Sequence, residues 1–147
     1  MNNYMRLEIP AKSTNEAFAR MAVGAFVSQA DPTVEELSDI KTAVSEGVTN
    51  AIIHGYENMS GVVSIVCRID EDMLEIVITD FGVGIENIEK AREPLYTSKP
   101  DEERSGMGFT VMETFMNRVE LSKNGAHGVK IQMFKKFGEV KRKIVGE

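Results

Sequence analysis

The order of apolar and polar positions divides the chain into strand-like and helix-like stretches. Alternation with a period of two, typical of half-buried strands, predicts strands at 4–10, 62–69, 73–80, 118–123 and 128–136. Helical spacing of apolar residues predicts helices from Ser13 or Thr14 to about Gln29, from Val34 to His54, and over 108–117. Turn residues at 70–72 and 124–125 join two pairs of strands as hairpins. This order predicts an α+β fold: a two-layer α/β sandwich whose mostly antiparallel (mixed) sheet carries its helices on one face.

The first two helices each have an apolar stripe that predicts their buried side. On the first helix these residues are Ala17, Phe18, Met21, Ala22, Ala25 and Phe26; on the second they are Leu37, Ile40, Val44, Val48, Ala51 and Gly55. Glu46, Asn50 and His54 follow at one-turn intervals on the opposite side of the second helix. They form either a solvated face or one wall of a polar cleft. Gly47, which has no evident structural role in a helix, favours the cleft.

Composition and charge narrow the class of protein. A length of 147 residues with 42% hydrophobic residues is typical of one globular domain, spanning 1–147. The net charge of −6 argues against direct binding of nucleic acid or an anionic membrane. A single cysteine excludes a disulfide framework, and two histidines far apart in sequence argue against a zinc site. Without a signal peptide or a long apolar run, we expect a cytoplasmic protein.

The strand at 73–80 ends in Asp80-Phe81-Gly82-Val83-Gly84. Asp80 continues the alternation of Leu74, Ile76 and Ile78, so its carboxylate is expected on the core side of the sheet. A buried carboxylate is costly unless it accepts hydrogen bonds, and the two glycines let a ligand approach the backbone. The stretch predicts either the floor of a ligand pocket with one anionic acceptor or a plain Asp-Gly turn.

A long irregular segment separates this strand from the last helix. Residues 85–105 are rich in charge, contain Pro94 and Pro100, and show little periodicity. Irregular segments of this length inside a compact domain are usually lids or binding loops, so we expect a lid at about 91–105. Gly106-Met107-Gly108 then opens a helix, where backbone N–H groups can bind phosphate.

These features together supply what a nucleoside triphosphate needs. The carboxylate of Asp80 can accept a hydrogen bond from the exocyclic amine of adenine. Mg²⁺ prefers oxygen ligands and keeps several waters, so Asn50 and phosphate oxygens suffice to hold it. Glu46, one helical turn from Asn50, is placed to act as a general base for a hydroxyl nucleophile.

In combination and order, three motifs resemble the boxes of the GHKL ATP-binding superfamily. They are Glu46-Gly47-Val48-Thr49-Asn50, Asp80-Phe81-Gly82-Val83-Gly84 and Gly106-Met107-Gly108. Two further stretches resemble the lid and phosphate loop of the serine kinases that double as anti-sigma factors in spore-forming bacteria. They are Pro94-Leu95-Tyr96-Thr97-Ser98-Lys99-Pro100 and Glu103-Arg104-Ser105-Gly106-Met107-Gly108-Phe109. The sporulation branch of that family is the nearer match, and the general stress branch is the alternative.

The resemblance implies ATP or ADP with Mg²⁺ as cofactors, a homodimer, and two partners: a sigma factor that is inhibited and an anti-anti-sigma protein phosphorylated on serine. It implies that Glu46 is the catalytic base, Asn50 the Mg²⁺ ligand and Asp80 the adenine anchor. Other residues expected around the reaction and the nucleotide are Arg104, His54, Gly82, Gly84, Thr97, Ser98, Ser105, Gly106, Met107, Gly108 and Phe109.

One position departs from the family pattern. Many relatives begin the last strand with Gly-Thr, whose Thr supports the adenine-binding Asp, whereas this chain has Gly128-Val129. Thr79 or a water is therefore expected to support Asp80.

Two other classes of function stay open, a nucleotide-gated binding module without catalysis and a detached histidine-kinase catalytic domain. Glu46 favours the kinase, and the chain has no phosphoacceptor helix pair. For the partners, strand 4–10 is expected to pair with its twin across a two-fold axis. Arg20 lies on a stripe with Glu16 and Gly24, away from Phe18 and Met21, and is either a partner contact or a solvated side chain.

Overall fold

The computed structural model describes residues 2–55, 61–82, 108–125 and 127–139. The elements in chain order are β1 (Asn2–Pro10), α1 (Asn15–Val27), a 3₁₀ turn η1 (Ser28–Ala30), α2 (Val34–Asn50), a π-helical turn η2 (Ala51–Gly55), β2 (Val62–Asp70), β3 (Met73–Asp80), α4 (Gly108–Phe115), β4 (Arg118–Lys123) and β5 (Val129–Lys136). Within these segments no helix is both long and apolar enough to cross a membrane.

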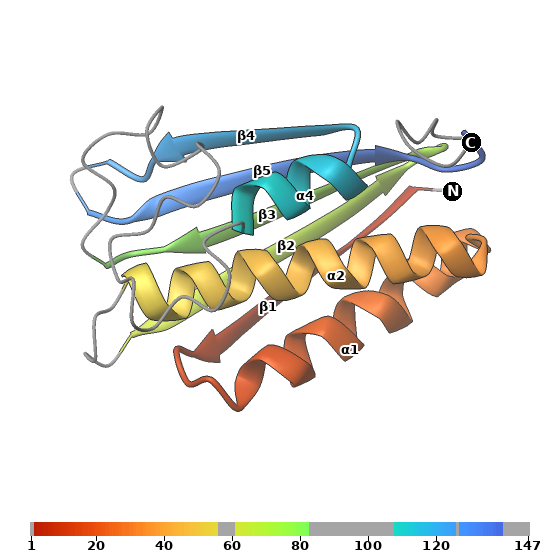
Figure 1. Cartoon of the computed structure of the whole chain (residues 1–147). Helices are drawn as coiled ribbons and strands as arrows, with labels where there is room; N and C mark the ends of the chain where they lie inside the picture. The colour runs from red at the N-terminus through yellow and green to blue at the C-terminus, as the bar shows by residue number, and fades with distance from the viewer. Residues whose placement is uncertain (1, 56–60, 83–107, 126, 140–147) are drawn as a thin grey trace.

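The described strands form one antiparallel sheet in the order β1-β2-β3-β5-β4. Helices α1, α2 and α4 lie together on one face of this sheet, and α2 runs across its middle (Figure 1). The predicted two-layer α+β architecture is confirmed. Because β5 is inserted between β3 and β4, β1 and β4 are left as the two edges of the sheet.

The core lies between the sheet and the helices. Alternate residues of each central strand face it, and on β3 these are Leu74, Ile76, Ile78 and Asp80, as the alternation predicts. On β5 the same phase carries Val129, Ile131 and Met133, and then Lys135. Two charged residues, Asp80 and Lys135, therefore share the apolar face of the sheet.

Helix α2 is fixed at its start and changes geometry at its end. Thr33 is the N-cap of a capping box: its Oγ1 accepts from the Glu36 N–H at 3.0 Å, and Glu36 Oε1 accepts from the Thr33 N–H at 2.9 Å. The predicted helix from Val34 to about His54 agrees in extent with α2 and η2 together, but the α-helix ends at Asn50 and η2 follows as a wider π turn.

Gly47 has a packing role that the sequence analysis missed. A Cβ at this position would lie 2.6 Å from Cδ1 of Ile78 and 3.6 Å from Sδ of Met112. The missing side chain thus lets α2 lie close to β3 and α4 at once. The expectation that Gly47 has no structural role is corrected.

The predicted inward face of α1 holds for Phe26 and is wrong for the other five residues of the predicted stripe. The buried residues are Ala19, Val23, Gly24, Phe26 and Val27. Phe18 and Met21 remain 54% and 59% exposed. Both stripes satisfy helical spacing, and the smaller side chains face α2 and the sheet, where they permit close packing.

Candidate functional site

Three element ends meet at one end of the molecule. These are the C-terminal ends of α2 and β3 and the N-terminal end of α4, with the start of β5 beside them (Figure 1). The sequence placed its three motifs on these same ends.

Asp80 is the buried acid of this region, with only 4% of its surface exposed. Its Oδ1 accepts a hydrogen bond from the Gly82 N–H at 3.0 Å, and the backbone N–H of Val129 also donates to the carboxylate. Burial disfavours the ionised form and raises the pKa of Asp80, although both hydrogen bonds act in the opposite direction. The result is an oriented carboxylate at the end of an apolar strand.

The turn between β4 and β5 packs directly on the Asp80 backbone. Gly128 has φ +92°, and a Cβ there would lie 2.0 Å from the Asp80 carbonyl oxygen. Asn124 Nδ2 donates to the same oxygen at 3.1 Å. Of the two supports expected for Asp80, Thr79 or a water, Thr79 is ruled out because strand alternation places it on the opposite face of the sheet.

Asn124 and the Val129 amide are parts of this site that were not predicted from the sequence. Backbone N–H groups have no residue signature, so nothing in Val129 itself could have indicated its role. The glycine that precedes it, where a strand begins beside a buried acid, was the available signal.

Glu46 and Asn50 converge on the first residue of α4. A Cβ added to Gly108 would lie 3.1 Å from Asn50 Nδ2 and 3.5 Å from Glu46 Oε2. Asn50 is buried and Glu46 half-buried, so neither is part of the freely solvated face left open as an alternative. The structure therefore brings together a carboxylate, an amide and a helix N-terminus, which is a suitable set of groups for phosphate and a hard cation.

The other predicted site residues have different outcomes. Gly82 is at the site as a donor to Asp80, and Phe109 is buried in the hydrophobic core. His54 lies in η2, but its side chain is not among the described ones. The lid at 91–105 and seven predicted site residues lie outside the described residues: Gly84, Thr97, Ser98, Arg104, Ser105, Gly106 and Met107. In the described part of the chain, no three His, Cys, Asp or Glu residues form a metal-binding group.

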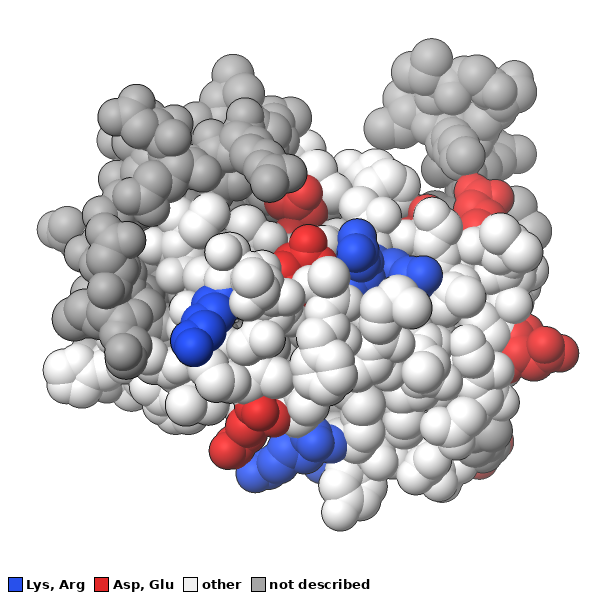
Figure 2. Space-filling model, turned by 90° about the horizontal axis from the view of Figure 1, so that it is seen from below, with Lys and Arg blue, Asp and Glu red and all other residues white. Residues whose placement is uncertain are grey.

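Arg20 borders a groove between α1 and α2. This groove has a volume of about 550 Å³ and is lined by Arg20, Met21, Val34, Leu37, Ser38, Lys41, Thr42, Ser45 and Glu46. Arg20 Nε lies 3.7 Å from Glu16 Oε2. Gly24, which was expected on the same exposed stripe as Arg20, is buried instead. A Cβ at Gly24 would lie 3.3 Å from Cδ of Lys41. Figure 2, which views the molecule from below Figure 1, shows a mostly uncharged surface with a few acidic and basic groups, some of them side by side.

A family model described as the histidine kinase-like ATPase domain matches residues 9–135. The chain belongs to this class of ATP-binding domains, in agreement with its sheet, its helix layer and the position of its motifs. Within this class the chain belongs to the anti-sigma F factor family. It is 64% identical to the anti-sigma F factor of Clostridium perfringens (strain 13 / Type A) over 138 residues, which are 93% of this chain and 99% of that protein. It is 59% identical to that of Clostridium beijerinckii over 140 residues, which are 95% of this chain and 98% of that protein. The predicted family and its sporulation branch are confirmed.

A solved structure confirms the fold class. The crystal structure of the RsbU and RsbW domains of a Mycobacterium tuberculosis protein aligns with a TM-score of 0.66 at 15% identity. The alignment covers 92% of this chain and 32% of that chain, so this chain spans about a third of that protein.

Proposed function

We propose that this protein is an ATP-dependent serine kinase that binds and inhibits a sigma factor and phosphorylates an anti-anti-sigma protein during sporulation. The observation that carries this proposal is the convergence of Glu46 and Asn50 on Gly108 at the start of α4, at the same end of the sheet as the buried Asp80. The relatives named anti-sigma F factors support the sigma-factor partner.

In this proposal Asp80 anchors the base of ATP. Its carboxylate accepts a hydrogen bond from the exocyclic amine of adenine, and the N–H groups of Gly82 and Val129 hold it in place for that contact. Because Asp80 is buried, the hydrogen bond is formed away from water and discriminates against bases that lack the amine.

The other end of the nucleotide lies at α4. Backbone N–H groups of its first turn bind phosphate oxygens, with the helix dipole favouring negative charge. The side-chain oxygen of Asn50 would hold Mg²⁺, which supplies neutralising charge at the phosphates. Glu46, beside Asn50, accepts the proton of the attacking serine hydroxyl.

A Glu46→Gln variant tests the kinase assignment. The amide keeps the size and polarity of the side chain but cannot take a proton, so we expect ATP binding to persist and phosphate transfer to fall about 10²–10⁴-fold. Calorimetry would measure ATP affinity, and labelled ATP would measure phosphorylation of the anti-anti-sigma protein. Glu120→Gln on edge strand β4 is the control, since it removes an exposed carboxylate on the sheet face opposite the buried Val119 and Leu121.

The outcomes separate the alternatives. Wild-type phosphorylation by Glu46→Gln would overturn Glu46 as the base. ATP binding without phosphorylation by the unaltered protein would leave a nucleotide-gated binding module.

For the sigma factor we propose the groove between α1 and α2, with Arg20 as a contact. Arginine is enriched among residues that dominate interface energy, so Arg20→Ala should weaken sigma-factor binding about tenfold or more. Lys12→Ala, in the exposed loop before α1, is the charge-matched control. Equal affinity of Arg20→Ala and the wild type would place the sigma factor elsewhere.

We also propose a homodimer. Strand β1 is an edge of the sheet that the described strands form, so a second copy can add a strand beside it. Sedimentation of the protein across a range of concentrations would test it, and a monomer at all of them would contradict it.

A further inference from the structure

Lys135 is a buried cation at the end of the core opposite Asp80. Its side chain lies on the core side of β5, as do those of Val129, Ile131 and Met133, and it is buried. A buried ammonium loses its hydration, which is unfavourable unless partners compensate for it. A lysine at this core position therefore needs partners that compensate for the lost hydration.

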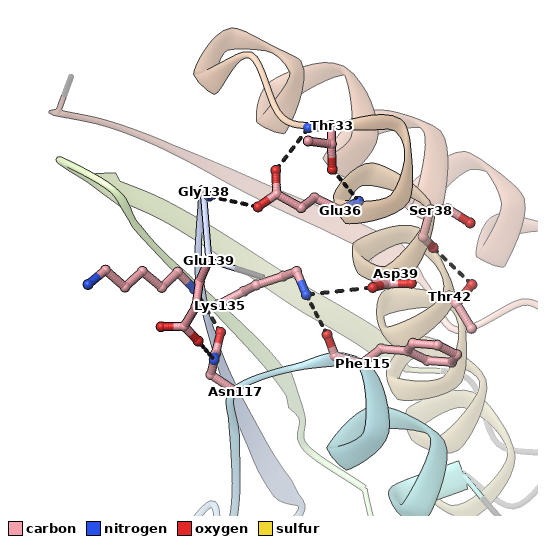
Figure 3. Close-up of polar contacts among 11 residues, drawn as sticks. Thr33, Glu36, Ser38, Asp39, Thr42, Phe115, Asn117, Lys135, Gly138 and Glu139 are labelled. Carbon is pink, nitrogen blue, oxygen red and sulfur yellow. Dashed lines mark hydrogen bonds and ion pairs between the residues drawn. The ribbon is translucent and has the colours of Figure 1, made fainter. Parts of the chain in front are cut away.

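The partners of Lys135 come from two different helices. Its Nζ donates to the carbonyl oxygen of Phe115, the last residue of α4, at 2.7 Å. The same Nζ lies 3.7 Å from Oδ2 of Asp39 on α2, with the two side chains 5% and 19% exposed. Figure 3 shows the side chain of Lys135 reaching from β5 to both of these groups.

These contacts fix the C-terminal end of α4. The last carbonyls of a helix have no partner within the helix, and a cation there also complements the helix dipole. Helix α4 has 8 residues. It is therefore about 12 Å long, and an isolated helix of that length is marginally stable in water. Its position depends on the groups that hold it.

The two ends of α4 contact two levels of the same helix. At its N-terminus Gly108 lies against Glu46 and Asn50, in the last turns of α2. At its C-terminus Phe115 is tied through Lys135 to Asp39, two turns earlier on α2. A shift of α4 along its own axis changes both contacts together.

We propose that Lys135, together with Asp39, is a positioning residue that sets where the N-terminus of α4 lies relative to Asn50 and Glu46. It touches no nucleotide and acts through the rigid length of α4. This inference rests on the proposed binding of ATP phosphates at that N-terminus, and its first measurement requires no nucleotide.

Neighbouring contacts hold the surrounding strands without Lys135. The Asn117 side chain accepts from the Lys136 N–H at 2.8 Å, and Glu36 Oε2 accepts from the Gly138 N–H at 2.8 Å (Figure 3). The apolar residues Met112 and Met116 remain in the core. A variant that lacks only the ammonium should therefore fold.

The test compares Lys135→Met with Lys136→Met. Methionine keeps most of the buried stem but loses the donor, whereas Lys136 is exposed and pairs with Asp72 at 3.8 Å. In protein without nucleotide, we expect hydrogen exchange in α4 to be faster in Lys135→Met and unchanged in Lys136→Met. Calorimetry should then show about fivefold to twentyfold weaker ATP binding for Lys135→Met, because the phosphate-binding N–H groups are no longer held in place. Lys135→Arg, which keeps a donor for both partners, should recover part of the affinity.

A further variant separates positioning from general stability. Ile69→Val removes one methyl group from the core on β2, away from α4, and lowers stability without touching the Lys135 contacts. It should leave ATP affinity and α4 exchange unchanged under conditions where every variant is folded. If Lys135→Met does not fold, Asp39→Asn takes its place and should show the same changes at smaller size.

The result that overturns the proposal is a folded Lys135→Met with wild-type α4 exchange and wild-type ATP affinity. Equal effects of Ile69→Val and Lys135→Met on ATP affinity would also overturn it, because they would show a purely structural role. Failure of the proposed function is a separate result, in which the unaltered protein itself does not bind ATP, and the exchange comparison then decides the positioning of α4 alone.

Discussion

Asp80 and Lys135 are opposite charges buried on the same face of one sheet, but at opposite ends. In the pairing of β3 with β5, Lys135 lies across from Leu74 at the start of β3, while Asp80 ends that strand. Lys135 contacts groups from two helices and links them to the sheet. Asp80 is held by backbone N–H groups of its own turn and of the neighbouring strand.

The two residues differ in their partners, and this difference indicates different roles: Lys135 holds elements together, whereas Asp80 is suited to bind a ligand. Partners that belong to different elements join those elements, so the group is needed for their relative position. Partners that are local amides fix the orientation of Asp80 without joining any helix to the sheet, and its raised pKa shows that they do not fully compensate for burial. An acceptor held in this way is suited to bind a ligand.

The largest effect on the Asp80 end is expected for Gly128→Ala. A Cβ there meets the Asp80 carbonyl at 2.0 Å, and φ is +92°. The backbone must move to relieve this clash. We therefore expect a loss of roughly 3 kcal/mol or more in the free energy of unfolding, together with loss of ATP binding. Urea titration measures the first and calorimetry the second.

Gly125→Ala is the matched control for that change. Gly125 also has positive φ, but a Cβ there meets nothing within 4 Å. It should cost only the backbone strain, about 1 kcal/mol. Equal losses for the two variants would show that close packing on Asp80 is not what requires a glycine.

The next effect is that of Asp80→Asn on ligand binding. Loss of one charge-assisted hydrogen bond to adenine corresponds to roughly 1.5–3 kcal/mol, or a tenfold to hundredfold weaker ATP affinity by calorimetry. Asp70→Asn, at the exposed end of β2, is the control. Unchanged ATP affinity would contradict Asp80 as the adenine anchor.

The same pair of variants tests the raised pKa. The folded-state pKa of Asp80 is above its unfolded value because burial disfavours the carboxylate. Between these two pKa values the folded protein binds more protons, so the free energy of unfolding falls as pH rises through that window. Urea titrations at a series of pH values should show this loss in the wild type and in Asp70→Asn but not in Asp80→Asn. A pH-independent difference between wild type and Asp80→Asn would contradict it.

A smaller effect is expected between the two ends, at Gly47. Alanine improves helix propensity by about 1 kcal/mol, but its Cβ would lie 2.6 Å from Cδ1 of Ile78. We expect net destabilisation of about 1–2 kcal/mol. Ile78→Val removes the clashing methyl group, so the double variant should be more stable than the sum of the single changes predicts. Simple additivity in urea unfolding would show that this contact does not limit the packing.

The smallest effect is expected at the Lys135 end, from Thr33→Ala. The change removes the side-chain half of the capping box and should cost about 1 kcal/mol of stability. ATP affinity should not change, because the cap lies at the far end of α2 from Asn50. A selective loss of ATP binding would show that the two ends of α2 are not independent.

Much of this architecture follows from local pattern. Alternation placed Asp80 on the core face, and helical spacing placed the start of the second helix at Val34. The inward face of α1 was not predictable, because two stripes of that helix fit helical spacing and only the neighbouring α2 selects between them. The Val129 amide and the partners of Lys135 are tertiary contacts between residues distant in sequence, and single-residue chemistry does not reveal them.

The strand order has a consequence for how the protein folds. The hairpins β2–β3 and β4–β5 close short loops, whereas pairing β3 with β5 must first close the whole chain between Asp80 and Val129. We expect the β3–β5 pairing to form late, because contacts between residues distant in sequence carry a larger entropic cost before they gain energy. Asp80 lies on the β3 side of this pairing, and Asn124, Gly128 and Val129 lie on the β5 side. The adenine end of the proposed site thus exists only once the two halves of the sheet have joined.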